Sequence, residues 1–556
     1  MEVEFAIFHP TNSSAARNRV KSQRRYPSML DLLIENGRII DGTGNPWFHG
    51  DLGIKDGKIA AIGMLKGEKA KEKLNVHRLM VSPGFIDIHT HCDAIPFVSP
   101  REEGRILQGI TTDTIGNCGI SLAPASKKTM KLLKKYVGPF CMDAPLPWNW
   151  QTMGDFLKQI EGKKTITNLA SMVGHGAVRI AVIGVDDRDP TPGELQRMKK
   201  ITGQAMDDGA VGFSSGLIYP PGVYSKKEEM IELCKVVAAK GGFYITHMRD
   251  EYNEVISAVQ ETIDVAERSG VPTIIAHHKT AGKKNWGKTR HTLRMIEEAR
   301  EKGIDIICEV YPYIMSSTFL HALLPPWAQE GGVLKLLERL RVPENRRRIK
   351  QEFESGIPGW ANLYESAGWD RILITSVNKQ KNLEGQTIEE VARTRKVEPA
   401  DVVFDVLLEE NGDAMMVFYG ISEEDIANIL KHPVSMVGSD SLPCPGKPHP
   451  RTYGTFPRVL SKYVRQDKIL TLPEAIRKMT AMPAQRLGLM DRGVLKLGMA
   501  ADITVFDPQI VEDKATVAEP RQYPTGIPYV IVNGQMAVRE GRWTGALAGK
   551  VMRKRS

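Results

Sequence analysis

The chain has 556 residues, 42% of them hydrophobic, which is enough for one large domain and one smaller domain with buried cores. No apolar run reaches membrane-spanning length, and Glu2 and Glu4 interrupt the N-terminus where a secretory signal needs a basic and then an apolar region, so we expect a cytoplasmic protein. The formal charge of +9 lies largely at the two ends, and no basic stripe with interleaved aromatic residues occurs, which argues against nucleic-acid binding.

The first 28 residues differ from the rest of the chain. They are polar, lack hydrophobic periodicity and carry five basic against two acidic side chains. We expect residues 1–28 to form a flexible basic extension. Met29 stands directly before the first patterned sequence and is a candidate translation start.

The cysteines argue against a secreted, disulfide-bonded protein. Six cysteines without paired spacing in so long a chain do not form a disulfide framework. Free thiols fit a reducing compartment, and one of them remains available as a metal ligand.

Both ends of the patterned sequence are typical of β-hairpins. Residues 29–80 and 488–556 contain two-residue turn signals between apolar runs. The signals are Asn36-Gly37, Asp56-Gly57 and Asn533-Gly534, and residues 501–508 (ADITVFDP) form a further predicted strand. Because the two ends look alike, we expect them to form one small β-sandwich that flanks a central domain.

The middle of the chain, residues 81–487, alternates short apolar runs with helical patterns. Each run ends in a polar or small residue. The eight runs cover residues 81–89, 111–119, 168–176, 209–216, 242–248, 272–279, 305–313 and 433–440. This pattern predicts an α/β fold, a (β/α)8 TIM-like barrel whose C-terminal strand ends open on one face, where such enzymes carry out their chemistry.

The spacing between the seventh and eighth runs is too long for one crossover. Residues from about 318 to 370 have a helical pattern, and residues 371–377 (RILITSV) look like an extra strand. Insertions on barrel enzymes usually hang from the active-site face, which favours a lid or a substrate-shaping subdomain. A surface for oligomer contacts is the alternative.

Residues 81–93, VSPGFIDIHTHCD, contain the first candidate metal ligands. Ser82-Pro83-Gly84 is predicted to form a turn, and a short strand after it delivers His89 and His91 on one face. With Asp93 beside them, these imidazoles would repel or desolvate each other when protonated, and a divalent cation removes that conflict because it takes neutral imidazole and carboxylate as ligands. The alternative is a surface turn that carries two histidines.

Several motifs together resemble the amidohydrolase superfamily, and within it the D-aminoacylases, or N-acyl-D-amino-acid deacylases. They are HTHCD, GNCG, ITHMRDE, IIAHHK, GSD and MPAQRLGLMDRGVLKLGMAADITVFDP. The more specific matches are GITTDTIGNCGISLAP and GFSSGLIYPPGVYS, in that order. The resemblance extends over nearly the whole chain from about Leu30.

This resemblance implies a zinc site at the barrel mouth. Cys118, His247 and His277 stand at the ends of predicted strands and match the tight site of the family, with a position left for water. His89 and His91 would mark a second, weaker site that shares the Cys118 sulfur. Many relatives bridge two metals with a carboxylated lysine on strand four, but that strand here reads GAVGFSSG, so the sulfur must form the bridge.

Asp440, in VGSDS, is the candidate catalytic residue. It could accept the proton of a metal-bound water as that water attacks the amide carbonyl, and then pass the proton to the departing amine. The metal lowers the pKa of the water and polarises the amide oxygen. A lone GSD is also consistent with a helix N-cap or an Asx turn.

The resemblance further implies a substrate with a carboxylate. Lys279, Tyr311 and Arg451 are the candidates to bind it, and Tyr219 and Ser317 match further contact positions of the family. The alternatives are solvated loop charges at Lys279 and Arg451 and a core aromatic residue at Tyr311.

Three other residues near the motifs receive weaker interpretations. We expect His175 near the site, as an orienting or a substrate-contacting residue. His278 should point away from the site by strand alternation. Arg249 is interpreted as a structural partner of Asp250 or Glu251.

The predicted function is zinc-dependent hydrolysis of small-molecule N-acyl-D-amino acids to a carboxylate and a free D-amino acid. One alternative is a cyclic-amide hydrolase of the dihydroorotase or hydantoinase kind, which more often carries the strand-four lysine. The other is a non-catalytic scaffold protein with the same fold, which predicts missing ligands, and none of the expected ligands is missing here.

Overall fold

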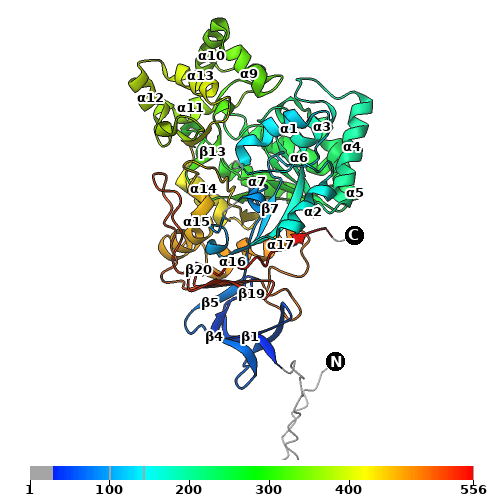
Figure 1. Ribbon diagram of the computed structural model, residues 1–556, viewed down its shortest axis with the longest axis vertical. Coiled ribbons are helices and arrows are strands. Elements are labelled where there is room, and N and C mark those ends of the chain that lie inside the picture. The colour runs from blue at the N-terminus through cyan, green and yellow to red at the C-terminus, as the bar shows by residue number, and fades with distance from the viewer. Residues whose placement is uncertain (1–28, 99–101, 142–143, 555–556) are drawn as a thin grey trace, which may run out of the picture.

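The computed structural model describes residues 29–98, 102–141 and 144–554, so the predicted extension 1–28 lies outside the described residues. A barrel occupies the middle of the molecule, a helical insertion lies at one end and a small β domain at the other (Figure 1). None of the helices in the described ranges is long and apolar enough to cross a membrane.

Eight parallel strands form the barrel in the order β16-β12-β11-β10-β9-β8-β7-β6. The ring closes where Thr90 bridges Ser441 in parallel and the His91 N–H donates to the Ser441 carbonyl at 2.8 Å. The predicted (β/α)8 architecture is therefore confirmed. The strands are β6 (Phe85–Asp87), β7 (Ile110–Ile115), β8 (Asn168–Gly174), β9 (Gly212–Gly216), β10 (Phe243–His247), β11 (Thr273–Ile275), β12 (Ile306–Val310) and β16 (Ser435–Val437).

Amphipathic helices cover the outside of the barrel. In α6 the buried residues recur at helical spacing, with Val255, Ala258, Val259, Thr262 and Ile263 on one face. The barrel helices are α1 (Met130–Val137), α2 (Met153–Lys163), α3 (His175–Val182), α4 (Pro192–Asp207), α5 (Lys227–Ala239), α6 (Val255–Ser269), α7 (Thr289–Glu301), α14 (Glu423–Lys431), α15 (Arg451–Arg458), α16 (Leu472–Met479) and α17 (Ala481–Arg486).

The first predicted barrel strand is in fact two strands. Ser82 and Pro83 do not form a turn, because they belong to β5 (Met80–Pro83), which pairs with β17 of the small β domain. The chain passes through Gly84, where a Cβ would collide with the side chain of Thr111, and enters β6 directly. The same run of sequence therefore joins the small domain to the barrel.

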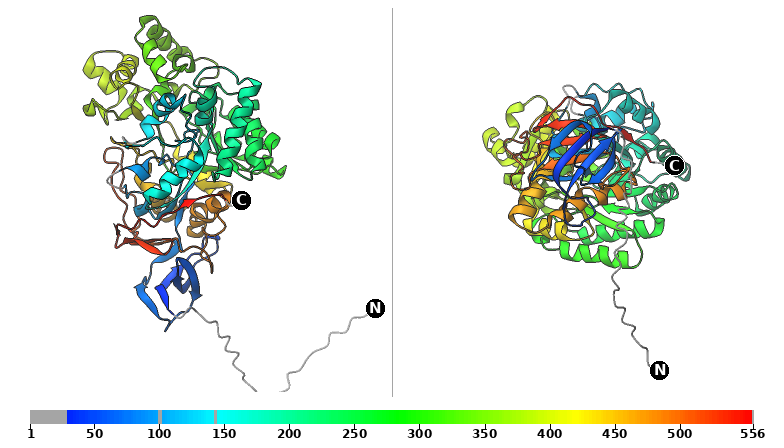
Figure 2. Two further views of the ribbon diagram at one scale, coloured as in Figure 1. Left: turned by 45° about the vertical axis from the view of Figure 1, so that its right-hand side comes forward. Right: turned by 90° about the horizontal axis from the view of Figure 1, so that it is seen from below.

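Strands from both ends of the chain form the small β domain, as predicted (Figure 2). Their order is β20-β19-β18-β17-β5-β1-β2-β3, and β4 pairs with β1. The remaining bounds are β1 (Leu30–Ile39), β2 (Phe48–Lys55), β3 (Lys58–Gly63), β4 (Ala70–Asn75), β17 (Ile503–Phe506), β18 (Tyr529–Val532), β19 (Gln535–Arg539) and β20 (Arg542–Trp543), while β21 (Val551–Met552) pairs with β8 of the barrel.

Two of the three predicted hairpin turns are confirmed. Asp56-Gly57 joins β2 to β3 and Asn533-Gly534 joins β18 to β19, and all four residues have positive φ. The third prediction is wrong, because Asn36-Gly37 lies inside the continuous strand β1. There the register with β2 shifts between Ile34 and Gly37, so the segment is an irregularity within a paired strand.

The insertion lies between β12 and β16 and contains a three-stranded sheet besides its helices. The predicted extra strand at 371–377 is β14 (Ile372–Ser376), which pairs with β15. The other elements are β13 (Met315–Phe319), α8 (Pro326–Gln329), α9 (Val333–Leu340), α10 (Pro343–Ser355), α11 (Leu363–Ala367), α12 (Ile388–Arg395), α13 (Pro399–Glu409) and β15 (Met415–Tyr419). Residues of β13, α11 and β15 line the pocket at the mouth of the barrel, so the insertion forms part of its wall.

Candidate metal centre and active site

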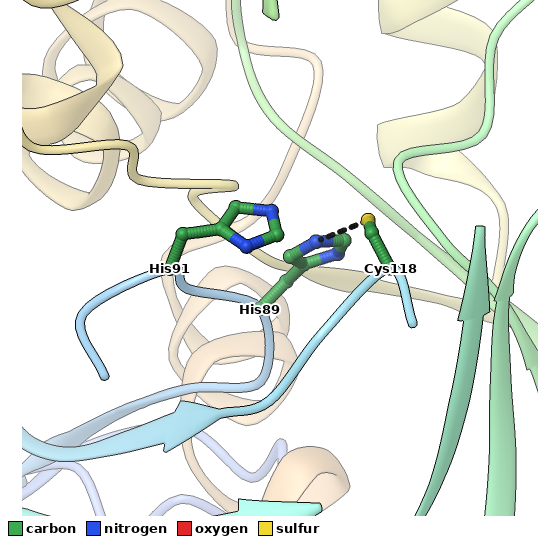
Figure 3. A group of neighbouring side chains, drawn as sticks. All are labelled: His89, His91 and Cys118. Atoms are coloured by element: carbon green, nitrogen blue, oxygen red, sulfur yellow. Dashed lines mark hydrogen bonds between the residues drawn. The ribbon is translucent and has the colours of Figure 1, made fainter. Parts of the chain in front are cut away.

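Six buried side chains meet where the barrel strands end. His89 and His91 follow β6, Cys118 follows β7, His247 ends β10, His277 follows β11 and Asp440 follows β16. Figure 3 shows the two histidines after β6 beside the sulfur. Residues that are far apart in the sequence therefore converge, as parallel strands of one barrel require.

The Cys118 sulfur belongs to two groups of possible metal ligands. One group is Cys118 with His89 and His91, and the other is Cys118 with His247 and His277; within each group the donor atoms lie within 4.8 Å of one another. The sulfur is 3.3 Å from His89 Nε2 and 3.7 Å from His277 Nε2. A sulfur and a nitrogen bound to one tetrahedral zinc lie about 3.6 Å apart, so these donors fit such an ion. Asp93 belongs to neither group.

The charges in the cluster suit metal binding. Burial alone would raise the pKa of the Cys118 thiol, but the surrounding imidazoles of His89, His247 and His277 outweigh it and hold that pKa well below its ordinary value. The sulfur is therefore a thiolate, the form in which cysteine binds metals. His247 Nε2 is buried and has no hydrogen-bond partner among the described residues.

Asp440 faces the histidine pair on one side and an arginine on the other. Its Oδ1 lies 3.4 Å from Nε2 of both His89 and His91, and its Oδ2 is 2.8 Å from Arg451 Nη2. Burial raises the pKa of this carboxyl, but Arg451 and His89 outweigh the burial and hold the pKa well below the ordinary value. Asp440 is thus an anion in the wall of the pocket.

Three residues of the cluster have backbone conformations that side chains rarely adopt. The φ angles are +51° at Cys118, +32° at His277 and +47° at Asp440. Such conformations persist only where the surrounding structure enforces them, and they gather at functional sites. Each left-handed residue sits just past a barrel strand and turns its side chain toward the cluster.

Two glutamates that the sequence did not single out as functional hold the imidazoles. Glu309 on β12 lies 2.6 Å from His89 Nδ1 and accepts the backbone N–H of His277. Glu251 lies 2.7 Å from His277 Nδ1. A carboxylate on the second ring nitrogen fixes the orientation of a metal-binding imidazole. An acid inside the apolar run IICEVYPY was a signal for Glu309, whereas Glu251 had none beyond its position near His247.

The predicted carboxylate-binding residues stand on the side of the pocket formed by β11, β12 and β16. Lys279 is buried and donates to Glu251 at 2.8 Å. The guanidinium of Arg451 lies over the ring of Tyr311, 4.6 Å from its centroid, and Arg451 Nε and Nη1 have no hydrogen-bond partner among the described residues. The Tyr311 hydroxyl is 2.9 Å from Ser316 Oγ.

Tyr219 and Ser317 also line the pocket. The Tyr219 hydroxyl is 2.8 Å from Thr318 Oγ1, and its ring is edge-on to His247 with 5.1 Å between centroids. Ser317 Oγ donates to the carbonyl of Met416 at 2.9 Å. Both residues lie on segments that face the metal-ligand cluster.

The structure corrects one weaker interpretation and confirms another. Arg249 pairs with Glu261 at 3.0 Å rather than with Asp250 or Glu251. His175 starts α3 and lies 2.6 Å from Glu229 on α5, and its role near the site stays a prediction. His278 points away from the site as expected, with Nε2 at 2.8 Å from Thr292 Oγ1 on α7.

The match to known proteins agrees with the barrel and its cluster. Residues 78–538 match the model of the family described as the amidohydrolase family. The chain belongs to the amidohydrolase family. A D-aminoacylase of Alcaligenes xylosoxydans xylosoxydans is 36% identical to it over 524 residues, which is 94% of this chain and 97% of the relative.

Two solved structures of relatives resemble nearly the whole chain. A D-aminoacylase described as having a binuclear metal centre, with one-metal activation and second-metal attenuation, has a TM-score of 0.79 at 34% identity and covers 94% of this chain and 100% of its own. An N-acyl-D-glutamate deacylase of Bordetella bronchiseptica, complexed with zinc and a phosphonate inhibitor, has a TM-score of 0.79 at 33% identity and covers 95% of this chain and 100% of its own.

The shared sulfur leads to a prediction for this amidohydrolase. Because Cys118 belongs to both ligand groups, Cys118→Ala should abolish tight metal binding and lower the content at both positions. Cys92→Ala is the matched control, since Cys92 is equally buried but belongs to neither group and burial raises the pKa of its thiol. Metal content per chain is measured by inductively coupled plasma mass spectrometry. Wild-type metal content in Cys118→Ala would contradict the assignment.

Proposed function

We propose that this chain hydrolyses the amide bond of N-acyl-D-amino acids and releases a carboxylate and a free D-amino acid. One observation carries the proposal: a buried cysteine sulfur is shared by two pairs of imidazoles, and one of these pairs contacts a carboxylate held by an arginine. The D-aminoacylase and N-acyl-D-glutamate deacylase relatives, which match nearly the whole chain, support it.

The metal in this proposal is zinc. Cys118, His247 and His277 would hold one ion tightly, and His89 and His91 would hold a second, weaker ion together with the same sulfur. Thiolate and imidazole are the ligands zinc prefers, and three protein ligands leave a position open for chemistry. When bound, zinc lowers the pKa of a water molecule and polarises the amide carbonyl.

Asp440 is the proposed general base and general acid. Its Oδ1 faces the centre of the cluster, where it would take a proton from the attacking water and pass it to the amide nitrogen as the C–N bond breaks. Arg451 holds Oδ2, which keeps Oδ1 turned inward and keeps the carboxyl ionised before the reaction. The proton balance closes, since the amine leaves with the proton that the water gave up.

Arg451 and Tyr311 are the proposed anchors for the substrate carboxylate, with Lys279 behind them. Arg451 Nε and Nη1 are buried without partners among the described residues, and a substrate carboxylate would accept a hydrogen bond from one of them. Lys279 already donates to Glu251. Its proposed contribution is therefore positive electrostatic potential at the substrate carboxylate, rather than a free hydrogen-bond donor. When the carboxylate and the amide carbonyl of the substrate are both held in place, only one direction remains for the substrate side chain. The D- and L-enantiomers differ in that direction, which is the basis for selecting the D-enantiomer.

The two alternatives receive less support. A cyclic-amide hydrolase with a bridging lysine needs that residue on the fourth barrel strand, and β9 reads GFSSG. A scaffold protein that has lost catalysis would retain the fold and lose the ligands. Both ligand groups, Asp440 and Arg451 are present here and in contact distance.

A paired assay tests the proposed function. The zinc-loaded protein should hydrolyse N-acetyl-D-methionine, with release of free methionine measured by amine derivatisation and chromatography. N-acetyl-L-methionine should react at least about 100-fold more slowly, since one misplaced substituent removes a near-attack geometry worth that factor. Hydantoin and dihydroorotate serve as the alternative substrates. Their turnover without turnover of the acyl-D-amino acid would overturn the proposal.

Asp440→Asn tests the proposed base. The amide keeps the size of the side chain but cannot accept the proton, so kcat should fall by a factor of about 100 or more, while bound zinc is unchanged. Activity and metal content are measured on the same preparation. Wild-type kcat in a variant that still binds zinc would refute the role of Asp440.

Arg451→Lys tests the carboxylate anchor, because lysine keeps the charge and loses the planar fork. We expect KM for N-acetyl-D-methionine to rise about tenfold or more, in line with the strength of a hydrogen bond between charged groups. N-acetyl-D-methioninamide lacks the carboxylate, so its KM should change little. Arg458→Lys is the control, since Arg458 lies on the same helix but pairs with Asp513. Equal changes for both substrates would contradict the anchor.

A further inference from the structure

A second pocket lies beside the active site and shares one wall with it. Its volume is about 270 Å³, and it is formed by α1, the loop after β9, the end of β13 and the start of α9. Tyr219 lines both this pocket and the pocket at the barrel mouth. The proposed hydrolysis, as described above, does not use this second pocket.

The lining of the second pocket is mainly apolar. Its walls include Leu132 on α1, Val185, Phe319 and Leu336. The His321 ring stacks on Phe319, with 4.8 Å between centroids, and burial lowers the pKa of this histidine to about 4, so it is uncharged at neutral pH. An apolar chain would therefore meet an uncharged surface.

The cations at the edge of this pocket do not make it an anion site. Lys135 pairs with Asp413 at 2.9 Å, and the Lys134 ammonium lies 5.4 Å from the centre of the Trp148 ring. Lys131, like Lys134, lies on an exposed part of α1. These side chains border the opening, and the interior beyond them is mainly apolar.

One layer of aromatic rings separates the pocket from the metal-ligand cluster. The Tyr219 ring is 5.1 Å from the His247 ring on one side and 5.8 Å from the Phe319 ring on the other. Phe140 completes the layer, since its ring is 4.6 Å from Phe319 and 4.8 Å from His91. The two spaces are thus one side-chain layer apart, and an acyl chain would have to displace part of that layer to reach the second pocket from the reaction centre.

The proposed pose of the substrate directs its acyl chain toward this layer. The amino-acid carboxylate is anchored at Arg451 and Tyr311, on the side of the site formed by β12 and β16. A secondary amide is trans, so the acyl carbon points away from the α-carbon. Across the site from the anchor stands Tyr219, which follows β9. The acyl chain thus leaves the reacting carbonyl on the side where the second pocket lies.

We propose that the second pocket is the binding site for the acyl chain, and that the enzyme acts on N-acyl-D-amino acids whose acyl group is a fatty chain of medium length. This inference rests on the proposed function. A cavity of about 150 Å³ holds benzene, so by proportion the pocket holds about ten carbon atoms. Each methylene that leaves water on binding can raise the affinity by up to about fourfold.

A series of acyl lengths tests the proposal. The zinc-loaded enzyme is assayed with acetyl, hexanoyl, octanoyl and decanoyl derivatives of D-methionine below their micelle concentrations. We expect kcat/KM to rise at least about tenfold from acetyl to octanoyl. Leu132→Trp fills the pocket and should lower the octanoyl-to-acetyl ratio of kcat/KM about tenfold. Leu497→Trp, at an exposed position of the small β domain, should leave that ratio unchanged.

The outcomes distinguish this inference from the proposed function. Cleavage of acetyl-D-methionine with no gain for longer chains overturns the acyl site and leaves the function standing. A ratio unaffected by Leu132→Trp also overturns it. Where that variant is unstable, Leu334→Trp gives the same readout from an exposed position on the same pocket. Failure to cleave any member of the series overturns the function, and the inference with it.

Discussion

The active-site face depends on the buried carboxylate of Glu309. It lies 2.6 Å from the His89 ring and accepts the backbone N–H of His277, so one side chain on β12 orients residues after β6 and β11. Gly438 makes room for it, because a Cβ at that position would lie 2.5 Å from Glu309 Oε2. The glycine of the GSD motif is thus explained by packing. Because the protein itself orients these imidazoles, a metal ion that binds them has less side-chain disorder to remove.

The same face also carries backbone strain. Cys118 and His277 hold left-handed backbone conformations that cost on the order of 1 kcal/mol or more each, and Asp440 shares the conformation at lower cost because aspartate tolerates it better. The hydrogen-bonded barrel strands before these residues enforce the conformations. A side chain that turns inward at a strand end can meet a partner from another strand, which a regular extended backbone would not allow.

Local patterns in the sequence predicted the features that depend on local physics. Eight apolar runs identified the barrel, and Asp56-Gly57 and Asn533-Gly534 identified hairpins, because positive φ at both turn positions is a local requirement. Asn36-Gly37 carried the same signal and was misread, since β2 pairs on both sides of it and long-range pairing overrode the turn.

The candidate site was predicted only as far as residue types at strand ends allow. His89, Cys118 and Asp440 could be proposed from motifs. The contacts among the site residues could not be predicted, because that of Arg451 with Asp440 and that of Glu251 with Lys279 depend on how the loops fold over the barrel. Nor does any periodicity reveal that Tyr219 borders two pockets, since that depends on the shape of the space between α1 and α9.

The construction of the small β domain from both chain ends has a consequence for biosynthesis. Ser82 of β5 donates to the carbonyl of Thr504, which lies 422 positions later. A ribosome adds roughly 5–20 residues per second, so β5 waits roughly 20 s or longer for its neighbour. During that time the nascent chain presents an unpaired strand edge, the kind of surface that chaperones shield. Docking of the sheet therefore waits until β17 (Ile503–Phe506) has been made, and a chain terminated before that strand would keep the edge exposed.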